Sequence, residues 1–202
     1  MKRATSVAAA NESALDRLAE SRTALLLAFV WGLAEATFFF LVPDVLLSLL
    51  GARALRPAIK ATVAALAGAL AGGAVMLAWG AREPAAAREF LDHVPAISQP
   101  HISSVQTQLA QHGLTAVLIG PVRGIPYKIY AVEWGAQAGG LTGFLLISIP
   151  ARYIRFLLSV LVFRGAMKLL EKKTQRRADR EALCWALFWV PFYSFYFARF
   201  GW

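Results

Sequence analysis

Five apolar stretches constrain this chain more than any other feature of its sequence. A helix of about 20 apolar residues is long enough to cross the ~30 Å hydrocarbon core of a bilayer. Inside lipid a helix satisfies its own backbone hydrogen bonds, so stretches of this kind indicate helices. The sequence therefore predicts an all-α membrane protein whose apolar stretches are residues 23–50, 59–80, 114–138, 141–163 and 183–200.

The composition and the charge favour the same environment. Of the 202 residues, 58% are hydrophobic, whereas a soluble domain has roughly 45–50%, and the mean hydropathy is +0.53. The net charge of +9 comes from basic residues beside the apolar runs. Anionic lipid headgroups are therefore the expected counterpart, rather than nucleic acid. The single cysteine, Cys184, excludes an internal disulfide.

Residues 23–50 are interrupted by a proline and are too long for one span. A continuous helix of this length would extend about 42 Å. Pro43 lacks a backbone N–H group and disfavours helix at Val42, so we expect a break there. The sequence predicts a re-entrant hairpin of two shorter helices, preceded by a retained N-terminal segment at residues 1–22.

Residues 114–138 predict a second re-entrant hairpin. Their uninterrupted apolar run ends at Val122 after about nine residues, which is too short to span a bilayer. The helix breakers Gly124 and Pro126 follow. Non-helical backbone at membrane depth is stable only where protein or a watery cavity covers it, so this hairpin is expected to face other parts of the protein.

The remaining segments are two plain spans, their connectors and a C-terminal helix. Residues 59–80 carry Gly68 and Gly72 four positions apart, a spacing that lets another helix approach closely and allows a homo-oligomer. Residues 141–163 form the second span. The aromatic-rich C-terminal helix either spans the bilayer or lies at its interface. The other expected segments are a polar connector at 81–113, a basic connector at 164–182 and this C-terminal helix at 183–202.

The distribution of lysine and arginine predicts the orientation. If both broken segments return to their own side, the N-terminus and the connectors 51–60 and 164–180 share one side. That side carries fourteen Lys and Arg, against three on the other. Cytoplasmic loops carry the basic excess, so we expect a multi-pass protein of the cell's inner (plasma) membrane with its N-terminus in the cytoplasm. The halves 23–80 and 114–163 then form an inverted repeat, which in transporters encloses a binding site near the midplane.

Seven ionisable residues lie inside the apolar stretches. Each costs roughly 2.5–3.5 kcal/mol at a helix centre, so seven unpaired charges would cost roughly 20 kcal/mol. A typical domain is stable by only about 5–15 kcal/mol. These residues are therefore expected to pair, to line a wet cavity or to lie near the interface: Glu35, Asp44, Arg123, Lys128, Glu133, Arg152 and Arg155.

Four of the seven have structural alternatives to a functional role. Arg152 and Arg155 can snorkel or brace neighbouring helices, and Glu133 can be a local partner of Lys128. The other three indicate function because broken helices expose N–H groups that bind anions, arginine matches phosphate oxygens, and buried carboxylates take up protons readily. These three lie beside the helix breaks: Glu35, Asp44 and Arg123.

Three motifs occur in order along residues 24–163. In the first, Asp44 follows Glu35 by nine positions across the turn at Pro43. In the second, His112-Gly113 and an apolar run precede Arg123-Gly-Ile-Pro126-Tyr-Lys128. The third combines a glycine nine positions after that proline with a later Arg-x-x-Arg-Phe: Gly135, Arg152, Arg155 and Phe156. This ordered set resembles the DedA (VTT-domain, SNARE-associated) family of membrane proteins, and its YqaA-like branch most closely.

The resemblance implies two opposed re-entrant hairpins that meet at mid-membrane, with spanning helices around them. It also implies a flippase or scramblase that moves undecaprenyl phosphate or a phospholipid, and dependence on the proton gradient. The residues expected to bind the lipid phosphate are Arg123, Lys128, Arg152 and Arg155. Those expected to couple protons or to gate are Glu35, Asp44 and Glu133. The expected hairpin breaks are Pro43, Gly124, Pro126 and Gly135.

Two other functions stay open from the sequence alone. The same charged residues suit a small-ion or solute transporter. A membrane-embedded lipid phosphate hydrolase is less well supported, because the chain has no G-x-S-x-G, no H-E-x-x-H and no convincing nucleophile. His93, His101 and His112 have spacings that suit no common metal site. We therefore expect no enzymatic activity, no catalytic residue, no cofactor and no metal.

Overall fold

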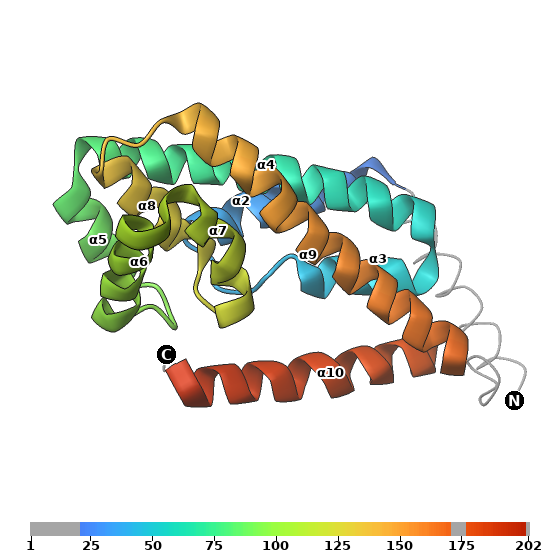
Figure 1. The fold of residues 1–202 in the computed structure, drawn as a ribbon. Coiled ribbons are helices and arrows are strands. Elements are labelled where there is room, and N and C mark those ends of the chain that lie inside the picture. The colour runs from blue at the N-terminus through green and yellow to red at the C-terminus, as the bar shows by residue number, and fades with distance from the viewer. Residues whose placement is uncertain (1–20, 171–176, 201–202) are drawn as a thin grey trace, which may run out of the picture.

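The computed structural model describes residues 21–170 and 177–200, and all regular structure within these ranges is helical (Figure 1). This confirms the all-α class. Within the described residues, two helices are long and apolar enough to cross a membrane, Leu55–Arg82 and Leu141–Leu169. The predicted N-terminal segment, 1–22, lies almost wholly outside the described residues, as does the middle of the basic connector.

The helices follow one another with short connections. In chain order they are α2 (Arg22–Thr37), α3 (Asp44–Arg53), α4 (Leu55–Arg82), α5 (Pro84–Asp92), α6 (Gln99–His112), α7 (Ala116–Ile119), α8 (Tyr127–Ala136), α9 (Leu141–Leu170) and α10 (Arg177–Phe200). Two short 3-10 turns flank α7, η1 (Gly113–Thr115) before it and η2 (Gly120–Arg123) after it.

The first apolar stretch forms two helices, α2 and α3, with residues 38–43 between them. Ser21 caps the start of α2, because its hydroxyl accepts a hydrogen bond from the Ala24 N–H group at 3.2 Å. Pro43 precedes α3 as its N-cap residue, where its missing N–H group costs nothing. The Trp31 indole donates to the Leu41 carbonyl at 2.9 Å, which satisfies part of the non-helical backbone.

The long helix α4 packs closely against α2 through small residues. A Cβ atom at Gly68 would overlap the Phe29 carbonyl oxygen, and one at Gly32 would overlap the Ala65 carbonyl oxygen. At Gly72 a Cβ atom would press on Ala36. The small-residue face of α4 is thus covered by α2 within the chain, so the spacing of Gly68 and Gly72 no longer supports a homo-oligomer through that face.

The second broken segment packs on the same long helix. Helix α8 crosses α4 where Gly80 meets the backbone of Val132 and Gly135 meets the backbone of Leu77. Helix α3 lies against α9, helix α7 also contacts α9, and α9 in turn contacts α4 (Figure 1). The two long helices therefore hold both broken segments between them.

The polar connector at 81–113 is folded rather than extended. Its helices α5 and α6 lie together at one end of the molecule (Figure 1) and pack on α4 and α8. Their inward side chains belong to the same hydrophobic core as Met76 and Ile129: Ala87, Leu91, Ile102, Val105 and Leu109. An apolar face of this kind holds a short helix in place.

Helix α10 is joined along one face to α3 and to the break that precedes α3. The contacts come from residues four apart, a spacing that places side chains on one helix face. They are an ion pair of 2.9 Å between Glu181 and Arg53, Trp185 to the Val45 carbonyl at 2.9 Å, Trp189 to the Ser48 hydroxyl at 3.0 Å, and Tyr193 to the Val42 N–H group at 2.9 Å.

Candidate functional site

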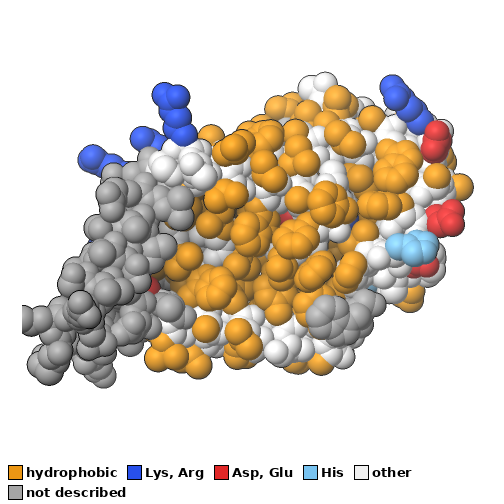
Figure 2. Space-filling model, turned by 180° about the vertical axis from the view of Figure 1, so that it is seen from behind, with side chains coloured by type: hydrophobic (Ala, Val, Ile, Leu, Met, Phe, Trp, Pro, Cys, Tyr) orange, Lys and Arg blue, Asp and Glu red, His pale blue; other side chains and the backbone are white. Residues whose placement is uncertain are grey.

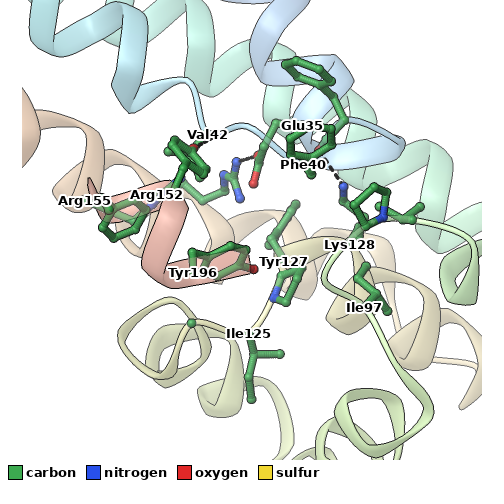
Figure 3. Close-up of a pocket in the computed structure, with 17 residues that line it drawn as sticks. Glu35, Phe40, Val42, Ile97, Ile125, Tyr127, Lys128, Arg152, Arg155 and Tyr196 are labelled. Atoms are coloured by element: carbon green, nitrogen blue, oxygen red, sulfur yellow. Dashed lines mark hydrogen bonds and ion pairs between the residues drawn. The ribbon is translucent and has the colours of Figure 1, made fainter. Parts of the chain in front are cut away.

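A cavity of about 120 Å³ lies where the two broken segments meet (Figure 3). Phe39, Phe40 and Val42 of the first break and residues 124–126 of the second form two of its walls. Helix α10 closes a third side with Phe192, Tyr193 and Tyr196. The ionisable residues that line the cavity come from three helices: Glu35 from α2, Lys128 from α8, and Arg152 and Arg155 from α9.

Glu35 and Arg152 form a buried ion pair across the cavity wall. The Arg152 Nη2 atom donates to Glu35 Oε2, and the two residues are 2% and 7% exposed. The Arg152 guanidinium also lies over the Tyr127 ring, 4.5 Å from its centroid, a favourable cation–π contact. The Tyr127 hydroxyl donates to Ser148 at 2.9 Å, so the ring is fixed in place.

Asp44 and Arg155 form a second ion pair beside the first. Their side chains are 2.9 Å apart, and the Ser159 hydroxyl donates to the other Asp44 oxygen at 2.6 Å. Asp44 is the first residue of α3, where exposed backbone N–H groups stabilise a negative charge. This pair links the first break to α9.

Lys128 is buried in the same cavity without a carboxylate partner. It is 2% exposed, and its ammonium group donates to the Phe39 carbonyl at 2.8 Å. Among residues 21–170 and 177–200, no carboxylate lies within ion-pair distance of it. A buried ammonium group with so few partners is costly, so this position favours a bound anion.

The cavity cluster, which we define as Glu35, Asp44, Lys128, Arg152 and Arg155, has two acids and three bases. With all five ionised, it carries one net positive charge. Within the described part of the chain, Arg152 Nε and Arg155 Nη2 are buried without a hydrogen-bond partner. Excess positive charge and unused donors together suit an oxyanion such as phosphate.

Glu133 does not pair with Lys128, so that sequence prediction is wrong. It lies fully buried on α8 and accepts two hydrogen bonds from Arg88 of α5, at 2.7 and 2.8 Å. Gln106 of α6 donates a third at 3.0 Å. The hydrogen bond to Glu133 raises the pKa of Arg88 above its usual value. This network joins α5 and α6 to α8, and Glu133 does not line the cavity.

Arg123 is not brought to the cavity cluster. It ends η2, its side chain is exposed, and it is absent from the cavity walls. The second predicted break is present at Gly124 and Pro126, and Gly124 has a φ of +75°, which glycine adopts readily. Gly135 is not a break, because it lies inside α8 and its lack of a side chain permits the crossing with α4.

Several residues at the site were missed from the sequence, and two of them carried a signal. Ser159 lies one helical turn after Arg155, on the same face of α9. Tyr193 continues the four-residue spacing of Glu181, Trp185 and Trp189. Arg88 had no such signal, because its contact with Glu133 depends on how the connector folds.

Comparison of the chain with protein-family models, with curated protein sequences and with solved structures found no match. Among the described residues, no group of three or more His, Cys, Asp or Glu side chains is placed to hold a metal ion. The cavity of about 120 Å³ lies between the two helix breaks, and the cavity cluster beside it has one more basic than acidic residue.

Proposed function

We propose that this chain is a multi-pass membrane protein of the DedA type that moves a phosphate-bearing lipid across the bilayer. The observation that carries the proposal is Lys128, a buried cation that has no carboxylate partner among the described residues, in a cavity between two helix breaks. The cavity cluster has a net positive charge, so it favours an anion. A lipid phosphate offers that charge while its chains stay in the hydrocarbon.

The surface supports a location in the bilayer. Figure 2 shows a face whose middle is covered with hydrophobic side chains, while charged side chains gather at its ends. Monomeric soluble proteins rarely expose a continuous apolar area larger than a few hundred Å². The exposed apolar side chains include Leu26 and Val30 on α2, Val63 and Val75 on α4, and Ile154 and Leu158 on α9. We place the N-terminus in the cytoplasm because of the basic excess on its side.

The helix contacts support an inverted repeat with two re-entrant hairpins. Exchanging α2, α3 and α4 with α7, α8 and α9 relates several of the observed helix contacts to one another. Helix α2 packs on α4 as α7 packs on α9, and α3 packs on α9 as α8 packs on α4. In transporters built this way, the substrate site lies at the interface of the repeats, which is the position of this cavity.

The ion pairs suggest how proton uptake and anion binding are coupled. A phosphate that enters the cavity competes with Glu35 for Arg152 and with Asp44 for Arg155. When either carboxylate takes up a proton, its arginine is released to the phosphate. Proton binding and lipid binding then reinforce each other, as a proton-coupled translocase requires.

Lipid flipping by the purified protein in liposomes tests the proposal. Undecaprenyl phosphate and labelled phospholipids are offered separately, with and without an inward proton gradient. We expect flipping of at least one lipid by the native protein and its loss in Glu35→Gln, which removes one ion pair. The matched control is Glu89→Gln, an exposed position on α5, which should flip at the native rate.

Other outcomes of this experiment would contradict the proposal. Native flipping by folded Glu35→Gln protein would show that the cavity cluster is not involved. Uptake of small phosphorylated solutes without lipid flipping would favour a solute carrier. Release of inorganic phosphate from the lipid would favour a hydrolase.

A further inference from the structure

An apolar groove of about 680 Å³ runs between α3 and α10, beside the charged cavity. Its volume falls within the roughly 300–1,000 Å³ typical of small-molecule sites. Aromatic and aliphatic side chains make up most of the lining: Leu41, Val45, Trp185, Trp189, Tyr193 and Phe197. The groove therefore suits a hydrocarbon chain rather than a polar ligand.

Hydrogen bonds fix the walls of the groove. The Trp185 indole N–H group donates to the Val45 carbonyl at 2.9 Å, and that of Trp189 donates to the Ser48 hydroxyl at 3.0 Å. Because α3 satisfies the polar atom of each indole, the apolar parts of both rings are left for the groove. Trp189 is 6% exposed, so this part of the wall is buried against the rest of the protein.

The groove and the cavity share a wall that is one residue thick. Tyr193 lines both spaces, and its hydroxyl oxygen accepts a hydrogen bond from the Val42 N–H group at 2.9 Å. In the first break, Val42 lines the cavity while the preceding residue, Leu41, lines the groove. A molecule in one space thus needs to pass only the Tyr193 ring to reach the other.

We propose that the groove holds a hydrocarbon chain of the lipid whose phosphate occupies the cavity, an inference that rests on the proposed function. The cavity cluster has excess positive charge, whereas the groove offers apolar surface. An amphiphile with an anionic head and a long chain satisfies both at once. Free phosphate would leave the groove empty, and an uncharged lipid would leave Lys128 uncompensated.

Quenching of tryptophan fluorescence by brominated lipid chains tests this inference, because Trp185 and Trp189 line the groove. The other four tryptophans are replaced by phenylalanine in every protein compared, so that only the groove is reported. The protein is placed in vesicles of unbrominated phosphatidylcholine that contain a few per cent of a dibrominated lipid. We expect dibrominated phosphatidic acid to quench at a lower mole fraction than dibrominated diacylglycerol, which lacks the phosphate. The Lys128→Gln variant should remove this difference. Equal quenching by both lipids in the native protein would overturn the inference.

A groove-filling variant separates this inference from the proposed function. Ser194 lines the groove, and Ser194→Leu adds apolar bulk there. In this variant, long-chain phosphatidic acid should compete with the dibrominated lipid roughly tenfold more weakly than in the native protein. Dihexanoyl phosphatidic acid should compete equally well in both proteins. Phe195→Leu is the control, because Phe195 lies on the same helix, is 69% exposed and does not line the groove.

The two proposals then fail in different ways. If neither form of phosphatidic acid binds the native protein, the proposed function is wrong. If both forms bind, and Ser194→Leu affects both equally or neither, the head site stands and the groove assignment is wrong. Circular dichroism and thermal unfolding of each variant establish that it is folded.

Discussion

At the scale of single residues, Lys128 should contribute more to anion binding than Arg123. We expect Lys128→Gln to weaken binding of a phosphate lipid roughly 10- to 100-fold, because a hydrogen bond to a charged group contributes about 1.5–3 kcal/mol. Arg123→Gln should weaken it much less, since Arg123 is exposed and outside the cavity. Titration of labelled phosphatidic acid in detergent measures both variants. A larger effect from Arg123 would contradict the assignment.

The ion pair of Glu133 and Arg88 predicts an asymmetry in stability. In Arg88→Met, the fully buried Glu133 loses its charged partner, which costs roughly 3–5 kcal/mol. In Glu133→Gln, the Arg88 side chain, already 36% exposed, can turn to water, so the cost should be only about 1–2 kcal/mol. Thermal unfolding in detergent compares the two, with exposed Arg82→Met as the control. Equal losses of stability in the two variants would show that Arg88 and Glu133 each need the other to the same extent.

Pairing between charged residues could be predicted from the sequence where those residues lie inside the apolar stretches. Glu35, Asp44, Arg152 and Arg155 meet in two ion pairs, as the energetic argument for pairing requires. Lys128, the alternative partner that the local sequence offered for Glu133, is not the actual one. The actual partner is Arg88, which comes from a connector whose packing on α8 could not be read from the sequence. Side chains from distant segments meet only once the fold is known.

At the scale of elements, the approach of α2 to α4 should tolerate no side chain at Gly68. A Cβ atom there would overlap the Phe29 carbonyl oxygen, so Gly68→Ala should separate the helices and lower the unfolding temperature strongly. Gly165→Ala is the matched control, because a Cβ atom on this α9 glycine meets nothing. It should be neutral or stabilising by up to about 1 kcal/mol. Similar behaviour of the two variants would contradict the close packing.

The attachment of α10 to the first break predicts a specific loss of stability. Tyr193→Phe removes the acceptor of the Val42 N–H group, and an unsatisfied buried donor costs about 1–3 kcal/mol. Ser194→Ala, on the same helix, removes only a hydroxyl that bonds to its own helix at Val190 and should cost less. Thermal unfolding in detergent distinguishes them. If the two variants were equally stable, the hydrogen bond would not hold α10 in place.

Helix breaks were more predictable than helix contacts. Pro43, Gly124 and Pro126 act through their own backbone geometry, so their effect can be read from the sequence. The position of α10 cannot, because its aromatic residues suit either lipid or protein equally well. Only the four-residue spacing from Glu181 to Tyr193 favours a helix partner.

At the scale of the whole molecule, the proposed topology predicts opposite labelling of the two ends of α4. In a Cys184→Ala background, Glu89→Cys on α5 should react with an impermeant maleimide added to intact cells. Arg56→Cys, an exposed position in the first turn of α4, should react only after the membrane is permeabilised. Labelling of both from outside would rule out a single crossing between them, and the reverse pattern would invert the orientation.

The cavity cluster contains an odd number of charges, so it cannot neutralise itself. A singly charged phosphate brings its sum to zero while both carboxylates stay ionised, and one proton taken up by Glu35 or Asp44 does the same for a doubly charged monoester. A charge that crosses the whole membrane field changes in energy by about 2.3 kcal/mol per 100 mV, but an electroneutral complex does not respond. Membrane voltage should therefore act on the protein without bound lipid rather than on the loaded protein. It should determine to which side of the membrane the empty site opens.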